Sequence, residues 1–476
     1  MLERALALRC SSSYQLDRGG GGERQTASQP NLIKRKEEIV RTASMNSGEQ
    51  ADKPSATRPL PGKAIAASIL GNTLEVFDFV SFAFFVVFIG KAFFPTYSSF
   101  GQLILAVATF GVGSIARPLG GIVIGAYADR VGRKAALTLT IGLMAVSTAL
   151  VGLTPGYQTI GAAAPLTILF ARLIQGFSAG GELGAATTYL IEMAPPDRRG
   201  YFASWQFASQ GFGTVIAALF GYLLALMLTS EQIQSWGWRI PFLFGVLIAP
   251  VGMYIRSHLD DTLDVTEKHT AAKQIFGQLL RHHRLDILWS CFALIGPTVS
   301  YYIVSSYMTT YAMTVLKLPT STSMLAGIVA GIVTIVGALC GGRLADRFGR
   351  KRMGIGAVVA FMLMIYPAFL IVSTARSAIV LFAMIAALTA VRMTISTVAL
   401  SLATEAFPKT VRTTGLSLAY NLATTVFGGT AQVVVTLLIK QTGDPTSPAW
   451  YLLGVSFISL IGLVMLKASK PAGALV

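Results

Sequence analysis

The chain has 476 residues, of which 53% are hydrophobic and only 13% are charged, and its mean hydropathy is +0.62. A composition this apolar excludes an ordinary water-soluble protein and predicts an integral membrane protein. The formal net charge of +16 does not indicate a nucleic-acid-binding protein, because the basic residues are concentrated in short loops between apolar runs.

Residues 1–62 differ from the rest of the chain and are predicted to form a disordered cytoplasmic tail. They are polar, rich in Gly, Ser and Pro, and contain no apolar run long enough to pack. A signal peptide is not expected, because residues 1–30 lack a continuous apolar segment. Two interpretations of residues 1–44 stay open: a genuine disordered extension, or a segment absent from the mature protein because translation starts at Met45.

Twelve apolar runs follow this tail, most of them as long as the roughly 20 residues that a helix needs to cross the hydrocarbon core. The fold class predicted from these runs is an all-α membrane protein with twelve transmembrane helices. The predicted spans are Ala64–Phe94, Leu103–Tyr127, Ala135–Leu153, Ala164–Met193, Phe202–Leu228, Ile240–Ile255, Asp286–Met313, Met324–Ala345, Met353–Val372, Ala378–Phe407, Thr413–Lys440 and Trp450–Leu466.

The loops between these spans carry very different numbers of basic residues. After Gly62, alternate loops and the C-terminal end hold nineteen Lys and Arg residues, whereas the opposite set of loops holds five. Basic residues mark the cytoplasmic side of membrane proteins. Both termini and the loop between spans six and seven are therefore predicted to be cytoplasmic in a multi-pass protein.

Two motifs occur twice and indicate an internal repeat. The first reads Gly125-x-x-x-Asp129-Arg130-x-Gly132-Arg133-Lys134 and recurs as Gly342-x-x-x-Asp346-Arg347-x-Gly349-Arg350-Lys351. The second is Glu192-x-x-Pro195 with Arg199, and it recurs as Glu405-x-x-Pro408 with Arg412. We therefore predict two six-helix halves with a binding site near the midplane between them. The predicted boundaries are 63–257 for the first half, 258–285 for a cytoplasmic linker, 286–470 for the second half and 471–476 for a C-terminal tail.

Charged residues inside the spans are the strongest functional signal, because an ion buried in hydrocarbon is costly and is tolerated mainly where it is paired or faces water. Arg117, Arg172 and Arg392 lie well inside their spans, which indicates an anionic substrate. The alternative is that Arg117 and Arg172 only neutralise acidic residues of the first half. This alternative is weaker for Arg392, because its span contains no acidic residue before Glu405.

Carboxyl groups are the candidates for proton coupling, because all four histidines lie between spans six and seven. Glu75 and Asp78 lie near mid-depth in the first span, and their spacing of three residues predicts that they share one helical face. Glu182 is a third candidate, and a structural ion pair is the alternative role for Asp78. The polar residues predicted to complete the substrate site are Gln175, Gln206, Tyr302, Tyr307, Tyr420 and Asn421.

Several motifs make the chain resemble the major facilitator superfamily and, within it, the metabolite:proton symporter family, closest to its bacterial citrate:proton symporters. The repeated loop motif and Arg172-x-x-Gln175-Gly176 carry the resemblance to the superfamily. The narrower resemblance rests on Gly71-Asn72-x-x-Glu75-x-x-Asp78-Phe79, Arg117-Pro118-x-Gly120, Gln175-Gly176-Phe177-Ser178-Ala179-Gly180-Gly181-Glu182, Trp236-Gly237-Trp238-Arg239-Ile240-Pro241-Phe242, Ser417-Leu418-Ala419-Tyr420-Asn421 and Thr442-Gly443-Asp444.

The resemblance implies the major facilitator fold and secondary active import of a polycarboxylate such as citrate or tricarballylate by proton symport with alternating access. It also implies a bacterial inner-membrane protein, expected to be a monomer in the lipid bilayer, whose partners are a small anion and protons. Arg392 departs from the citrate symporters, so another small metabolite, such as 2-oxoglutarate, shikimate or betaine, is an alternative substrate. A drug efflux antiporter is the remaining alternative, although span five lacks the Gly-Pro pair followed by Gly that is typical of antiporters.

The repeated cytoplasmic loops are predicted to form a conformational latch, in which an Asp at a helix end pairs with neighbouring arginines. The alternative is that these positive charges only set the topology, which explains the arginines but not the identical spacing in both halves. The predicted latch residues are Asp129, Arg130, Arg133, Asp346, Arg347 and Arg350.

No cofactor, metal or enzymatic activity is expected. The sequence has no Gly-x-x-x-x-Gly-Lys-Ser/Thr phosphate loop, which argues against a pump driven by ATP. Its three cysteines, Cys10, Cys291 and Cys340, do not suggest a disulfide framework or a zinc site.

Overall fold

The computed structural model describes residues 62–131, 133–192, 198–257, 277, 279, 281–408 and 411–466. Side chains are described in these ranges except at 62–68, 125–126, 128–134, 137, 182–192, 199, 248–249 and 251–257. The described residues belong to one compact unit, Leu60–Val476. The predicted N-terminal tail, the C-terminal tail and most of the predicted linker lie outside the described residues, so these boundaries stay predictions.

The described part of the chain is helical throughout. Its elements are α3 (Gly62–Phe84), α4 (Val86–Phe93), α5 (Ser99–Ile115), α6 (Arg117–Val131), α7 (Arg133–Leu153), α8 (Tyr157–Ile160), α9 (Ala163–Glu192), α10 (Arg199–Met227), α11 (Ser230–Ser235), η1 (Gly237–Arg239), α12 (Ile240–Ser257), α14 (Arg284–Ser300), η2 (Tyr301–Tyr307), α15 (Met308–Thr314), α16 (Thr320–Phe348), α17 (Arg350–Ala375), α18 (Ala378–Glu405), α19 (Arg412–Ala423), η3 (Thr424–Gly428), α20 (Gly429–Thr442) and α21 (Ser447–Met465). Here η1 is a 3-10 helix, whereas η2 and η3 are π-helices.

Each predicted span falls on helical structure, which confirms the all-α fold class. Among the described residues, eight helices are long and apolar enough to cross a membrane, and α3 with α4 forms a ninth span that bends by 64°. The other three predicted spans fall on α7, α9 and α12. This correspondence is consistent with twelve transmembrane helices in two sets of six.

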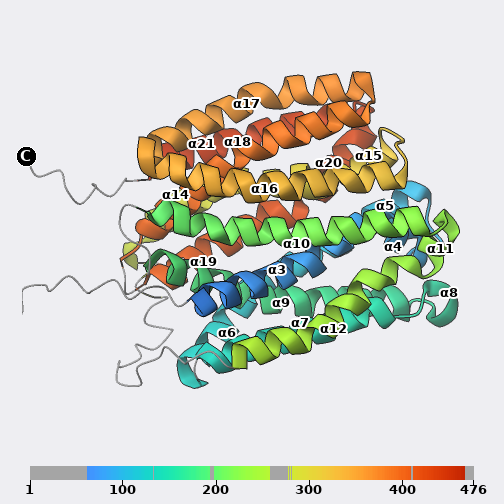
Figure 1. The fold of residues 1–476 in the computed structure, drawn as a ribbon, viewed down its shortest axis with the longest axis horizontal. Coiled ribbons are helices and arrows are strands. Elements are labelled where there is room, and N and C mark those ends of the chain that lie inside the picture. Colours follow the sequence, from blue (N-terminus) through green and yellow to red (C-terminus); the bar gives the residue numbers. More distant parts are fainter. Residues whose placement is uncertain are drawn as a thin grey trace, which may run out of the picture. The chain divides into compact units, whose positions relative to one another are not determined.

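The two sets of helices pack against each other along several pairs (Figure 1). Figure 1 shows α16, α17, α18 and α21 on one side and α6, α7, α9 and α12 on the other, with α3 and α10 between them. The most extensive contact between the sets is α10 with α16, and α5 with α20 and α9 with α19 add to it. Residues distant in the sequence therefore meet along the junction between the halves.

A proline interrupts the second span next to a predicted site residue. Pro118 has no N–H to donate to the carbonyl of Ser114, and the helix breaks at Ala116 between α5 and α6. The hydroxyl of Thr425, in η3 of the other half, donates to that carbonyl at 2.7 Å. The break therefore gives the two halves a hydrogen bond inside the bundle, where a backbone group without a partner is costly.

The seventh span is irregular for the same reason. Pro297 cannot donate to the carbonyl of Ala293, and the hydroxyl of Ser459 donates to it instead at 2.7 Å. The span then continues as the π-helix η2 before returning to regular geometry in α15. The eleventh span has a similar π-helix, η3, between α19 and α20. π-helical turns of this kind occur often at functional sites.

Glycines let α9 approach α5 and α6 at backbone contact distance. A Cβ atom at Gly176 would stand 1.6 Å from the carbonyl oxygen of Gly113, and one at Gly180 would stand 1.9 Å from that of Arg117. No other residue fits at either position without moving the backbone. This packing fixes the position of Arg117 relative to α9.

Candidate functional site

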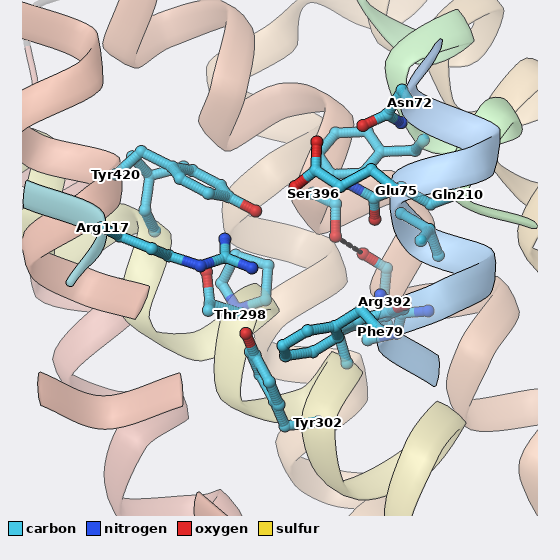
Figure 2. Close-up of a pocket in the computed structure, with 15 residues that line it drawn as sticks. Asn72, Glu75, Phe79, Arg117, Gln210, Thr298, Tyr302, Arg392, Ser396 and Tyr420 are labelled. Atoms are coloured by element: carbon cyan, nitrogen blue, oxygen red, sulfur yellow. Dashed lines mark hydrogen bonds between the residues drawn. The ribbon is translucent and has the colours of Figure 1, made fainter. Parts of the chain in front are cut away.

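A cavity between the two halves brings together side chains from six spans (Figure 2). Its walls come from α3, α6 and α10 in the first half and from α14 with η2, α18 and α19 in the second. A site at the junction of two repeats is the expected position for a ligand in this kind of architecture. The lining residues are Asn72, Glu75, Val76, Phe79, Arg117, Phe207, Gln210, Leu294, Pro297, Thr298, Tyr301, Tyr302, Arg392, Ser396 and Tyr420.

Arg117 is the cation that the first half contributes to the cavity. It begins α6 directly after the break in the second span and is 8% exposed. Its guanidinium carbon lies 5.3 Å from the centre of the Phe79 ring, and Glu75 and Tyr302 are close enough to interact with its charge. The Nε atom has no hydrogen-bond partner among the described residues. Arg117 therefore retains an unused donor beside the cavity.

Arg392 is the cation that the second half contributes, and neutral groups hold it. It lies in α18 and is 1% exposed. Its Nη2 atom donates to the hydroxyls of Ser305 at 3.0 Å and Thr334 at 3.3 Å, and its guanidinium carbon lies 5.5 Å from the centre of the Tyr301 ring. No carboxylate forms an ion pair with Arg392 within the described part of the chain. In Figure 2, Arg117 and Arg392 reach the cavity from different helices on opposite sides of the view.

Arg172 lies inside the first half and is absent from the cavity lining. It is 1% exposed, and Asp78 on α3 is close enough to attract its charge. Its Nη1 atom donates to the Oε1 atom of Gln175, and Nη2 donates to the carbonyl of Phe110 at 3.3 Å. Thr148 lies close to the Asp78 carboxyl group, but its hydroxyl donates to the carbonyl of Met144 at 2.8 Å. The Oδ1 atom of Asp78 has no partner among the described residues. Arg172 and Asp78 thus form a buried pair of opposite charges that attract each other, although no direct ion pair joins them among the described contacts.

Glu75 and Asp78 occupy different environments although three residues separate them. Glu75 lines the cavity, whereas Asp78 is 4% exposed and lies beside Arg172 within the first half. Although the two carboxyl groups are neighbours on α3, Glu75 therefore belongs to the cavity and Asp78 to the contact with α9.

The three predicted amides lie outside the cavity lining. Gln175 accepts from Arg172, and Gln206 is 2% exposed with an Nε2 atom that has no partner among the described residues. Asn421 donates to the carbonyl of Gly180 at 3.2 Å and so joins α19 to α9. Of the predicted substrate-binding residues, the structure brings Arg117, Tyr302, Arg392 and Tyr420 together, whereas Tyr307 lies outside the cavity lining.

Several lining residues were not among the predicted binding residues. They have polar side chains and come from five different elements: Asn72, Gln210, Thr298, Tyr301 and Ser396. The sequence contained a signal only for Asn72, which belongs to the motifs that carry the family resemblance. The position of Tyr301 depends on the π-helix η2, which has no local signature in the sequence.

The second copy of the repeated loop motif forms a contact between the halves. The carboxylate of Asp346, at the end of α16, accepts from the backbone N–H groups of Gly200 at 3.0 Å and Tyr201 at 2.9 Å. These N–H groups belong to the first turn of α10, where the helix dipole favours an anion. Arg350 donates to Asp346 at 2.9 Å through Nη2 and also pairs with Glu405.

Of the other predicted latch residues, the structure describes the side chain of Arg347 only. The guanidinium carbon of Arg347 lies 5.5 Å from the centre of the neighbouring Phe348 ring, away from the contact just described. The side chains of Asp129, Arg130, Arg133 and the proton-coupling candidate Glu182 lie outside the described residues. Among the residues that are described, no group of His, Cys, Asp and Glu has the arrangement of a metal site.

Comparison with known proteins gives a family and relatives that cover most of the chain. A family model for the Major Facilitator Superfamily matches residues 69–431. A citrate-proton symporter of Klebsiella pneumoniae is 40% identical over 403 residues, which are 84% of this chain and 90% of that protein. The citrate-proton symporter of Salmonella typhi is 37% identical over 88% of this chain and 97% of that protein. A putative proline/betaine transporter of Staphylococcus aureus (strain MSSA476) is 35% identical over 87% of this chain and 90% of that protein.

Solved structures share the fold at lower sequence identity. A D-xylose-proton symporter has a TM-score of 0.70 and 18% identity, and the match covers 85% of this chain and 98% of that one. A partially occluded, inward-open structure of the xylose transporter XylE from E. coli has a TM-score of 0.68 and 18% identity, over 84% and 96% of the two chains. At this identity the likeness concerns the fold alone.

We predict that Arg172→Gln destabilises the protein by roughly 3–5 kcal/mol, because it leaves the charge of Asp78 buried without its cation. The double variant Arg172→Gln/Asp78→Asn should recover part of the loss, because it contains no unpaired charge at this position. The measurement is the midpoint of thermal unfolding in detergent, with Arg376→Gln as an exposed control of the same residue type. A double variant no more stable than Arg172→Gln would show that Asp78 and Arg172 do not depend on each other.

Proposed function

The chain belongs to the major facilitator superfamily, and from this premise we propose that it imports a polycarboxylate such as citrate together with protons. Its relatives are transporters, so the chain is a multi-pass membrane transporter and not an enzyme. The curated relatives named for citrate support the choice of substrate, as does the cavity between the two halves.

The observation that carries this proposal is the charge of the cavity. Arg117 and Arg392 line it from opposite halves, and Glu75 is the acidic residue among the described lining residues. This excess of cations favours an anion, and guanidinium groups bind carboxylates through paired, charge-assisted hydrogen bonds. The hydroxyls of Tyr301, Tyr302 and Tyr420 supply further donors. A substrate with several carboxylates is able to bind both arginines at once.

Proton coupling is assigned to carboxyl groups of α3 in this proposal. Glu75 lines the cavity and is in position to exchange a proton when the cavity opens to water. Asp78 carries the second proton site, where neutralisation of the carboxylate would change the charge balance with Arg172. Glu182 stays a third candidate.

Asp346 forms the cytoplasmic latch in this proposal, and it does so by holding the first turn of α10. Alternating access requires this contact between α10 and α16 to break when the cytoplasmic side opens. Arg350 keeps the carboxylate of Asp346 oriented and ties it to Glu405 on α18. The matching residues of the first copy, Asp129, Arg130 and Arg133, are proposed to act in the same way.

The transporter is proposed to act as a monomer in the inner membrane of a bacterium. The bacterial origin of its relatives supports this location. The distribution of basic residues over the loops supports cytoplasmic termini.

Cells that express the protein should accumulate radiolabelled citrate or tricarballylate in preference to 2-oxoglutarate, shikimate and betaine. Arg392→Gln should weaken citrate binding about tenfold to a hundredfold, because it removes a charged donor worth roughly 1.5–3 kcal/mol. The amount of folded protein should change little, because no described ion pair of Arg392 is broken. Uptake over a range of concentrations in proteoliposomes measures both effects.

Arg376→Gln is the matched control for this experiment, because Arg376 is exposed and lies outside the cavity lining. Accumulation of betaine without any polycarboxylate would contradict the proposed substrate class. Unchanged citrate affinity in Arg392→Gln would instead remove Arg392 from the site and leave the substrate class standing.

Asp346→Asn keeps the shape of the side chain and removes its charge, so we expect slower transport with substrate affinity retained. The charge-assisted contacts to α10 and Arg350 contribute roughly 1–3 kcal/mol to the closed cytoplasmic side. The measurements are turnover in proteoliposomes and equilibrium citrate binding in detergent. Asp286→Asn serves as the control, because Asp286 also lies near the predicted cytoplasmic side but contacts only His283 among the described residues. Altered selectivity among polycarboxylates would place Asp346 in the substrate site and exclude a latch.

A further inference from the structure

The ring of Phe79 lies against two arginines that have different roles. The guanidinium carbon of Arg172 lies 4.9 Å from the centre of this ring, and that of Arg117 lies 5.3 Å from it. Arg172 belongs to the buried pair with Asp78, whereas Arg117 lines the cavity. Phe79 follows Asp78 directly in the sequence and itself lines the cavity. One aromatic side chain therefore connects the buried charge pair with the cavity.

Further aromatic rings extend this contact to the other half. The Phe79 ring lies 4.4 Å from that of Phe110 and 5.8 Å from that of Tyr302, measured between ring centres. The guanidinium carbon of Arg172 also lies 4.6 Å from the Phe82 ring centre and 5.0 Å from that of Phe110. Three phenyl rings of the first half thus surround Arg172, and Tyr302 of η2 touches two of them.

The net charge of Arg172 and Asp78 together depends on the protonation of Asp78. When Asp78 is ionised, the two groups neutralise each other, and little net charge acts on the cavity. When Asp78 binds a proton, Arg172 retains its charge, and its remaining partners are neutral: Gln175, the carbonyl of Phe110 and the negative faces of the phenyl rings. The positive potential at the far side of Phe79, where Arg117 and the cavity lie, then rises. Proton binding at Asp78 and anion binding in the cavity therefore favour each other, and the linkage is reciprocal.

We propose that Phe79 is the positioning residue that links proton binding at Asp78 to anion binding in the cavity, because its ring contacts both Arg172 and Arg117. This inference rests on the proposed function. The ring holds the two cations at a fixed separation in an apolar contact, where water does not screen their interaction. A flexible aliphatic side chain lacks the aromatic face that attracts both guanidinium groups.

The charged and titratable groups around Asp78 come from several elements. Arg172 faces it from α9, and Thr148 from α7 is an uncharged partner. Toward the cavity, the groups are Glu75 on α3 itself, Arg117 on α6, Tyr301 and Tyr302 on η2, and Tyr420 on α19. α5 contains no titratable residue, and neither do the residues of α12 whose side chains are described. On α10, the described titratable residues are Tyr201 in the first turn and Tyr222 near the other end, and α4 contributes Lys91.

The test is the ratio of citrate affinities at acidic and neutral pH, measured by equilibrium binding to the full chain in detergent. We expect a ratio in the wild-type protein of about 5 to 150, the range typical of coupled sites. The ratio in Asp78→Asn gives the contribution of groups other than Asp78, which include citrate itself and Glu75 in the cavity lining. In Phe79→Leu, the ratio should fall to that of Asp78→Asn, because the loss concerns the coupling and not the affinity at one pH. Phe79→Tyr keeps the aromatic face and should keep the wild-type ratio.

Phe85→Leu is the matched control, because Phe85 is a buried phenylalanine of the same span with no described contact to an arginine. If Phe79→Leu does not fold, Phe79→Met fills the space with a flexible side chain and should show the same loss. A wild-type ratio in Phe79→Leu or Phe79→Met, or an equal loss of affinity at both pH values, would overturn the role of Phe79. Absence of citrate binding by the wild type would refute the proposed function itself. A full ratio in Asp78→Asn would remove Asp78 as the coupled proton site and leave the proposed substrate standing.

Discussion

The burial of positive charge in an apolar bundle is the constraint on which the site depends. Arg117, Arg172 and Arg392 are each at most 8% exposed, and an isolated ion in this position costs several kcal/mol. Each is held differently. Arg172 has a carboxylate partner and three phenyl rings, Arg117 has Glu75 and Phe79 nearby, and Arg392 has neutral hydroxyls and an aromatic ring. A cation held only by neutral groups keeps its capacity to bind an anion, and this distinguishes Arg392 from a structural arginine.

Irregular backbone next to the cavity brings the two halves together around these charges. Pro118 has no N–H to donate to the carbonyl of Ser114. This carbonyl accepts a hydrogen bond from the hydroxyl of Thr425 in the other half. Arg117 lies beside this break and points into the cavity. The π-helix η2, which begins four residues after Pro297, places both Tyr301 and Tyr302 in the lining. Breaks in the helices therefore supply both the contacts between the halves and the side chains of the site.

Local properties of the sequence predicted the spans, the repeat and the positions of the buried arginines. Hydropathy and the cost of a buried charge depend on a residue and its neighbours along the chain, so the sequence alone reveals them. The direction in which a side chain points depends on packing. Glu75 and Asp78 are only three residues apart on α3, yet one lines the cavity and the other lies near Arg172, because α3 packs between the cavity and the first half. The partner of Asp346 could not be predicted from the sequence either, since it is the backbone of α10 and not a side chain.

Arginines from both halves are proposed to select a polycarboxylate. Ligand-induced thermal stabilisation of the wild-type protein tests this selection most directly. Citrate and betaine would be compared at equal ionic strength in detergent. Saturating citrate should raise the unfolding midpoint, since a ligand at a hundred times its Kd stabilises the folded state by about 2.7 kcal/mol. Betaine, with one carboxylate and a permanent positive charge, should leave the midpoint unchanged. Stabilisation by betaine with no effect of citrate would contradict the selection of a polycarboxylate.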